Sequence, residues 1–136
     1  MVPDQPSLPN VDELGGIPVL DQETLEQLIE IDGGELGLIT EMFGLFSADQ
    51  PRRLSLLKDA IESNDLTKIM EISHAMKGSA GTIGAARLRA VAAILEALGR
   101  GHKVESAPEY LFGHLERAYL EAHDALKRHI NETTQS

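Results

Sequence analysis

The chain has 136 residues, of which 42% are hydrophobic and 25% are charged, a balance that fits one folded domain. It contains no cysteine, which excludes disulfides, thiolate nucleophiles, zinc fingers and iron–sulfur clusters. The formal net charge of −10 argues against nucleic acid as a partner. The sequence shows neither a signal peptide nor an apolar run of about 20 residues, so we expect a cytoplasmic protein that contacts no membrane.

The charged residues are distributed unevenly along the chain. Residues 1–51 contain 11 acidic residues and no Lys or Arg, whereas residues 52–103 contain nine basic residues against five acidic ones. Residues 104–136 are again acidic, with six acidic residues and three basic ones. The basic middle segment fits either a mixed solvated surface or a local patch for an acidic partner or a phosphoryl group.

The first part of the chain predicts a tail followed by a short helix. Residues 1–19 hold four prolines, a Gly-Gly pair and no sustained hydrophobic period, so we expect a flexible tail there. From Leu20 the spacing of apolar residues is helical almost throughout. Asp21 is placed to cap a short helix, which should end at Gly33 and Gly34.

Four longer helices are predicted after this short one. The first is expected at about 35–62, where Pro51 should kink it or divide it after Ala48. The other three are expected at about 66–82, 85–101 and 108–130. No segment shows the alternation of apolar and polar residues that is typical of a β-strand. The sequence therefore predicts an all-α, up-and-down four-helix bundle with an additional short N-terminal helix, spanning 20–131 and followed by a C-terminal tail at 132–136.

His74 differs from the other four histidines because of the residues around it. On a helical wheel the buried stripe consists of Ile69, Ile72, Met76, Ala80 and Ile83. His74 falls on the opposite, exposed side, with Lys77 one turn away and Gly78 and Gly81 beside it. Exposed glycines cost a helix about 1 kcal/mol each relative to Ala, so these two indicate a surface cleared for a second protein. Together the residues predict a phosphoryl-accepting site.

The segment HAMKGSAGTIGAARL at 74–88 resembles the signature of histidine-containing phosphotransfer (HPt) domains, in which a histidine is followed by an apolar residue, Lys-Gly, small residues and a further Gly. The resemblance covers about residues 20–130 and implies that His74 accepts a phosphoryl group from the aspartate of a receiver domain and passes it to another. It further implies that Lys77 screens charge and that Gly78 gives clearance beside the imidazole.

The resemblance also implies the partners of the protein. These would be receiver domains of response regulators, a hybrid sensor histidine kinase, or both. The chain has no room for a separate nucleotide-binding domain, so we expect a monomeric phosphoryl carrier rather than an enzyme, without cofactor or metal.

Residue 96 departs from the pattern of the family. Some members place a Gln on the following helix, where its amide can hydrogen-bond the site, whereas an ungapped alignment puts Glu96 there. A carboxylate would repel a phosphoryl group at close range. We therefore expect Glu96 to turn away from the site or to pair with a nearby base.

The docking surface is expected on the basic segment 52–103. The resemblance implies an acidic phosphorylation pocket in the receiver, and opposite charges favour association. Apolar contact would come from Met70 and from residues beside Gly81, with Arg87 and Arg89 among the surrounding bases. The two arginines follow the turn predicted at residue 84, where the wheel gives no firm direction for either side chain.

Other classes of protein fit the sequence less well. Glu71 and His74 form one Glu-x-x-His pair, but a di-iron bundle needs two such pairs and no second one exists. The glycine-rich stretch KGSAGTIG matches neither of the two phosphate-binding loop patterns, G-x-x-x-x-G-K-[ST] and G-x-G-x-x-G. A non-catalytic helical adaptor that docks a receiver domain without phosphotransfer is the alternative, and His74→Gln would leave such docking intact.

Overall fold

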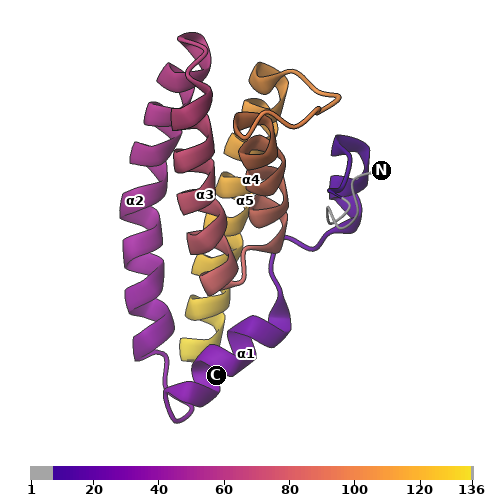
Figure 1. Cartoon of the computed structure of the whole chain (residues 1–136). Helices are drawn as coiled ribbons and strands as arrows, with labels where there is room; N and C mark the ends of the chain where they lie inside the picture. Colours follow the sequence, from indigo (N-terminus) through magenta and orange to yellow (C-terminus); the bar gives the residue numbers. More distant parts are fainter. Residues whose placement is uncertain (1–7, 136) are drawn as a thin grey trace.

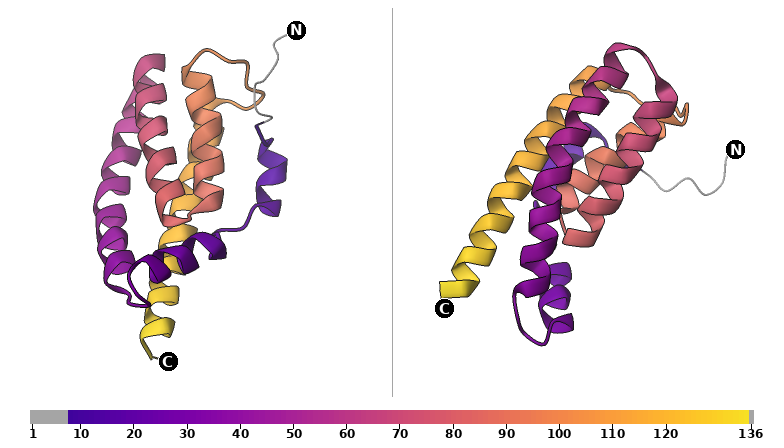
Figure 2. Two further views of the ribbon diagram at one scale, coloured as in Figure 1. Left: turned by 60° about the horizontal axis from the view of Figure 1, so that its bottom comes forward. Right: turned by 90° about the vertical axis from the view of Figure 1, so that its left-hand side faces the viewer.

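The computed structural model describes residues 8–135, in which a short 3-10 helix precedes five α-helices (Figure 1). The elements are η1 (Val11–Gly16), α1 (Gln22–Ile31), α2 (Gly37–Glu62), α3 (Leu66–Ile83), α4 (Ala86–Gly99) and α5 (Pro108–Gln135). Helices α2 to α5 stand side by side, and α1 crosses the end of the bundle at which α3 meets α4 (Figure 2). The predicted all-α bundle with an additional short N-terminal helix is confirmed.

The core is aliphatic, as the scarcity of aromatic residues requires. Its largest fully buried apolar side chains come from all five α-helices and include Leu25, Ile39, Leu57, Ile69, Met76, Ile83, Leu88, Leu95, Leu111, Leu115 and Leu126. Burial of such side chains contributes roughly 1.5–3 kcal/mol each, which holds short helices that would not form in isolation. No described helix carries an apolar stretch long enough to cross a bilayer.

Helix α3 is fixed at both ends by local interactions. The side chain of Asp65 caps its first turn by accepting a hydrogen bond from the backbone N–H of Lys68 at 3.1 Å. Gly84 ends it in the left-handed conformation with φ of 79°, which favours glycine. The carbonyl of Gly84 accepts a hydrogen bond from the N–H of Asp21 at 2.7 Å, so the turn between α3 and α4 also anchors the start of α1.

Pro51 was expected to kink α2 or to divide it after Ala48, and the structure shows that α2 is not divided. The proline removes one backbone donor from the helix, but the helix continues because both of its halves pack against the same core. Phe46 before the proline and Leu54 after it are both buried in the bundle.

The predicted tails differ from the structure. Within the predicted N-terminal tail, Val11–Gly16 forms η1, and its Leu14 is buried in the core. Residues 1–7 of this tail lie outside the described residues. At the other end α5 continues through most of the predicted C-terminal tail, as far as Gln135.

Candidate functional site

The face of α3 that carries His74 points away from the core, as the helical wheel predicts. Ile69, Met76, Ala80 and Ile83 are buried and Ile72 is half-buried, whereas the His74 side chain is 62% exposed. Because α3 and α4 run side by side, the exposed imidazole lies next to a side chain of α4. That side chain is Glu96.

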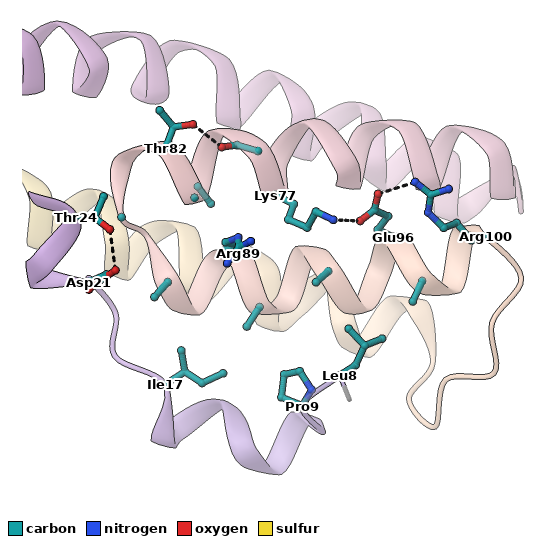
Figure 3. A pocket seen from close by; sticks show the side chains of 18 of the residues that line it. Leu8, Pro9, Ile17, Asp21, Thr24, Lys77, Thr82, Arg89, Glu96 and Arg100 are labelled. Atoms are coloured by element: carbon teal, nitrogen blue, oxygen red, sulfur yellow. Dashed lines mark hydrogen bonds and ion pairs between the residues drawn. The ribbon is translucent and has the colours of Figure 1, made fainter. Parts of the chain in front are cut away.

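The carboxylate of Glu96 connects three groups of the site. Its Oε2 lies 2.6 Å from Nδ1 of His74 and accepts a hydrogen bond from Arg100 at 3.0 Å. Its Oε1 accepts a hydrogen bond from Nζ of Lys77 at 2.5 Å, and Figure 3 shows the carboxylate between the two cationic side chains. Of the two alternatives expected for Glu96, the structure shows the pairing with nearby bases, and the carboxylate stays at the site.

Glu96 is ionised at neutral pH despite its burial. Its side chain is only 7% exposed, and this burial raises its pKa. Hydrogen bonds from Lys77, Arg100 and His74 outweigh the burial and lower the pKa from 4.5 to about 2. An ionised carboxylate only accepts hydrogen bonds, so the hydrogen between Glu96 and His74 belongs to Nδ1. In this arrangement Nε2 is the ring nitrogen that faces away from Glu96, and no residue of the described chain hydrogen-bonds to it.

The local charges favour an anion at this site. Lys77 and Arg100 contribute two positive charges against the one negative charge of Glu96. The surplus positive charge lies beside an exposed nucleophilic nitrogen, an arrangement suited to a phosphoryl group. Among the described residues, no group of three or more His, Cys, Asp or Glu side chains could hold a metal ion.

The two glycines of the exposed face have different surroundings. A Cβ added to Gly78 would meet no atom within 4 Å, so the space beside it is open. A Cβ added to Gly81 would lie 3.1 Å from Nε of Arg89. Gly81 is therefore not part of a cleared surface, because the arginine side chain from α4 already occupies that space. This corrects the expectation that both glycines give docking clearance.

The three expected docking residues also differ in their environments. Met70 is half-buried, and its backbone lies so close to Gly99 that a Cβ there would be 2.5 Å from the nitrogen of Met70. Arg89 is exposed, and its guanidinium has no hydrogen-bond or ion-pair partner in residues 8–135. Both side chains lie at the surface where α3 and α4 meet.

Arg87 is engaged within the protein, which corrects its assignment to the docking surface. Its Nε donates to the carbonyl of Ile17 at 2.9 Å, and its Nη1 lies 3.5 Å from a carboxylate oxygen of Glu121. Arg87 thus ties the N-terminal segment to α4 and α5.

Sequence reasoning singled out Glu96 from the resemblance but did not include it among the site residues, and it did not identify Arg100. The spacing of four residues between them is typical of a helical ion pair and could have indicated Arg100. No local signal indicated that Arg100 and Lys77 hold the same carboxylate next to His74.

Comparisons with known proteins bear on the family and the fold of the chain. The sequence profile described as the Hpt domain matches residues 41–132. The structure is similar to that of histidine-containing phosphotransfer protein B (HptB) from Pseudomonas aeruginosa PAO1, with a TM-score of 0.73 and 25% identity over 85% of this chain and 96% of that one. It also resembles the histidine-containing phosphotransfer domain of ArcB from Escherichia coli, with a TM-score of 0.70 and 23% identity over 84% and 94% of the two chains. A search of curated proteins finds no significant match. Because the profile covers more than half of its length, the chain belongs to the Hpt domain family, whose members act in phosphorelays.

Proposed function

We propose that this protein is a phosphoryl carrier that accepts a phosphoryl group on Nε2 of His74 from the aspartate of a receiver domain and passes it to another receiver. The observation that carries the proposal is the pairing of an exposed His74 with a buried, ionised Glu96 through Nδ1. This pairing leaves Nε2 as the nucleophile on the exposed side of a domain of the Hpt family.

The transfer needs no proton to leave the imidazole. The lone pair of Nε2 attacks the phosphorus of the aspartyl phosphate, the phosphorus–oxygen bond breaks, and the aspartate leaves as a carboxylate. The phosphorylated ring keeps its hydrogen on Nδ1 and carries a positive charge. Glu96 accepts the hydrogen bond from Nδ1 and stabilises that charge, and the reverse steps return the phosphoryl group to an aspartate.

Lys77 acts first through Glu96 in this proposal. Its ammonium holds Oε1, while Arg100 holds Oε2, so the carboxylate stays fixed beneath the imidazole. An ammonium has three N–H donors, and two of those on Lys77 remain for an incoming phosphoryl oxygen. Gly78 leaves open space for the approaching receiver.

The test uses two phosphoryl donors, labelled phosphoramidate and a panel of phosphorylated receiver domains. We expect both to label the wild-type protein in acid-labile form, and His74→Gln to remove the label. His114→Gln is the control, since it replaces a half-buried histidine on α5 and should be labelled like the wild type. A label that persists in His74→Gln would overturn the assignment. Receivers that bind the wild-type protein without any transfer would support the non-catalytic adaptor instead.

A further inference from the structure

A groove of about 1070 Å³ begins beside the candidate site and runs along α4 (Figure 3). One side is formed by residues of α3, which include Lys77, Gly78, Gly81 and Thr82. Its floor is a stripe of small side chains on α4, which consists of Ala86, Ala90, Ala93 and Ala97. The N-terminal segment forms the opposite wall with Leu8, Pro9 and Ile17.

This wall is held in place by the rest of the protein. Leu14, in the middle of the segment, is buried in the core, and Arg87 donates hydrogen bonds to the carbonyls of Ile17 at 2.9 Å and of Gly15 at 3.5 Å. The segment precedes residues 41–132, which match the family profile. The wall therefore lies outside the part of the chain that matches the family profile.

The side of the groove nearest α3 is basic. Arg89 lies across Gly81, and its guanidinium has no partner within the described part of the chain. Arg100 and Lys77 line the same groove, each already bonded to Glu96. Arg89 is thus placed to bind a carboxylate from outside, which a guanidinium can hold with two parallel hydrogen bonds.

We propose that this groove docks the receiver domain that exchanges phosphoryl groups with His74, and that the N-terminal wall selects among receivers. The proposal rests on the proposed function for the identity of the partner. Lys77 and Gly78 border both the groove and His74, so a receiver that reaches the imidazole also covers the mouth of the groove. An apolar side chain of the receiver packs between Leu8 and the alanines of α4, and one of its carboxylates pairs with Arg89.

The experiment measures binding of purified receiver domains to the full chain by calorimetry, and takes as probe the receiver with the highest affinity for the wild type. The test variants are Leu8→Asp in the wall and Arg89→Glu on the basic side of the groove nearest α3. Their matched controls are Leu120→Asp and Arg117→Glu, which make the same changes at exposed positions of α5. Labelling of His74 by phosphoramidate is measured for all four variants.

We expect each test variant to bind the receiver about tenfold more weakly than its control, because apolar contact or a charge pair is lost. Arg89→Glu should also slow association and flatten its salt dependence. Labelling by phosphoramidate should stay at the wild-type rate, because this small donor needs no docking surface. Leu8→Asp should in addition change the ranking of the receivers in the panel by their affinity for the protein.

Equal affinities of the test variants and their controls would overturn the docking proposal, as would the absence of any receiver that binds the wild type. The proposed function fails separately, if a receiver binds but neither donor labels His74.

Discussion

Nδ1 of His74 on α3 lies 2.6 Å from Oε2 of Glu96 on α4, and the two residues are 22 positions apart in the sequence. The contact joins an exposed side chain to a buried one, because the imidazole is 62% exposed and the carboxylate only 7%. Lys77 and Arg100 hold the same carboxylate from its other sides. The orientation of the imidazole is thereby linked to the packing of α3 against α4.

Removal of the Glu96 carboxylate should change the tautomer of His74. In Glu96→Ala, Nδ1 loses its acceptor, so the hydrogen is no longer held on this nitrogen and Nε2 is less often the nucleophile. We expect altered nitrogen-15 chemical shifts of the imidazole and slower labelling by phosphoramidate. Glu71→Ala, which removes an exposed carboxylate from α3, is the control and should retain the wild-type shifts.

Glu96 should also make stability depend on pH. Its pKa in the folded protein is about 2, below the ordinary value of 4.5, so its contribution is complete above pH 4.5 and is lost as the pH falls towards 2. A shift of this size corresponds to about 3 kcal/mol. Urea unfolding at a series of pH values should show Glu96→Gln less stable than the wild type near pH 7, with the difference shrinking below pH 4.5. A difference that stays constant down to pH 2 would contradict this linkage.

The open space beside Gly78 predicts a variant that folds well and transfers poorly. A Cβ at this position meets no atom within 4 Å. Replacing glycine by a residue with a side chain improves helix propensity by up to about 1 kcal/mol. Gly78→Leu should therefore be as stable as the wild type or more stable, while transfer from receivers falls at least tenfold because the leucine fills the space beside the imidazole. Gly113→Leu, on α5 and equally open, should transfer normally.

Gly99 should tolerate no side chain. A Cβ there would lie 2.5 Å from the backbone nitrogen of Met70, so Gly99→Ala must push α4 away from α3. We expect a loss of about 1–3 kcal/mol in the free energy of unfolding, as in other overpacked sites. Gly44→Ala in α2 meets no atom within 4 Å and should instead gain up to about 1 kcal/mol. Urea denaturation of the two variants measures the contrast.

Arg87 should control the N-terminal wall of the groove. Arg87→Ala removes the hydrogen bonds to the carbonyls of Gly15 and Ile17, so the backbone N–H of Ile17, which donates to Leu14, should exchange its hydrogen faster. Glu121→Gln removes only the charge partner of Arg87 and should leave this exchange close to the wild-type rate. Equal exchange in both variants would show that burial of Leu14 alone holds the segment.

Features that depend on local spacing could be predicted from the sequence. The apolar period of 3.6 residues indicated the helices. It also placed Ile69, Met76, Ala80 and Ile83 inside and His74 outside, because the spacing of residues along one helix determines which of them share a face. The capping role of Asp65 and the left-handed Gly84 were predictable for the same reason. The segment 74–88 indicated the Hpt family, which the sequence profile confirms.

Only the tertiary structure decided what lies next to these residues. Glu96 faces His74, Arg89 covers Gly81, and Arg87 holds the segment around Leu14, and each of these contacts joins parts of the chain that a helical wheel treats separately. The wheel of one helix gives the direction of a side chain but not the rotation and height of the neighbouring helix. The sequence by itself determined that His74 is exposed beside Lys77 and Gly78. The packing of α4 against α3, and of η1 against α4, determined which charges surround the imidazole and which groove leads to it, because those depend on distances between helices.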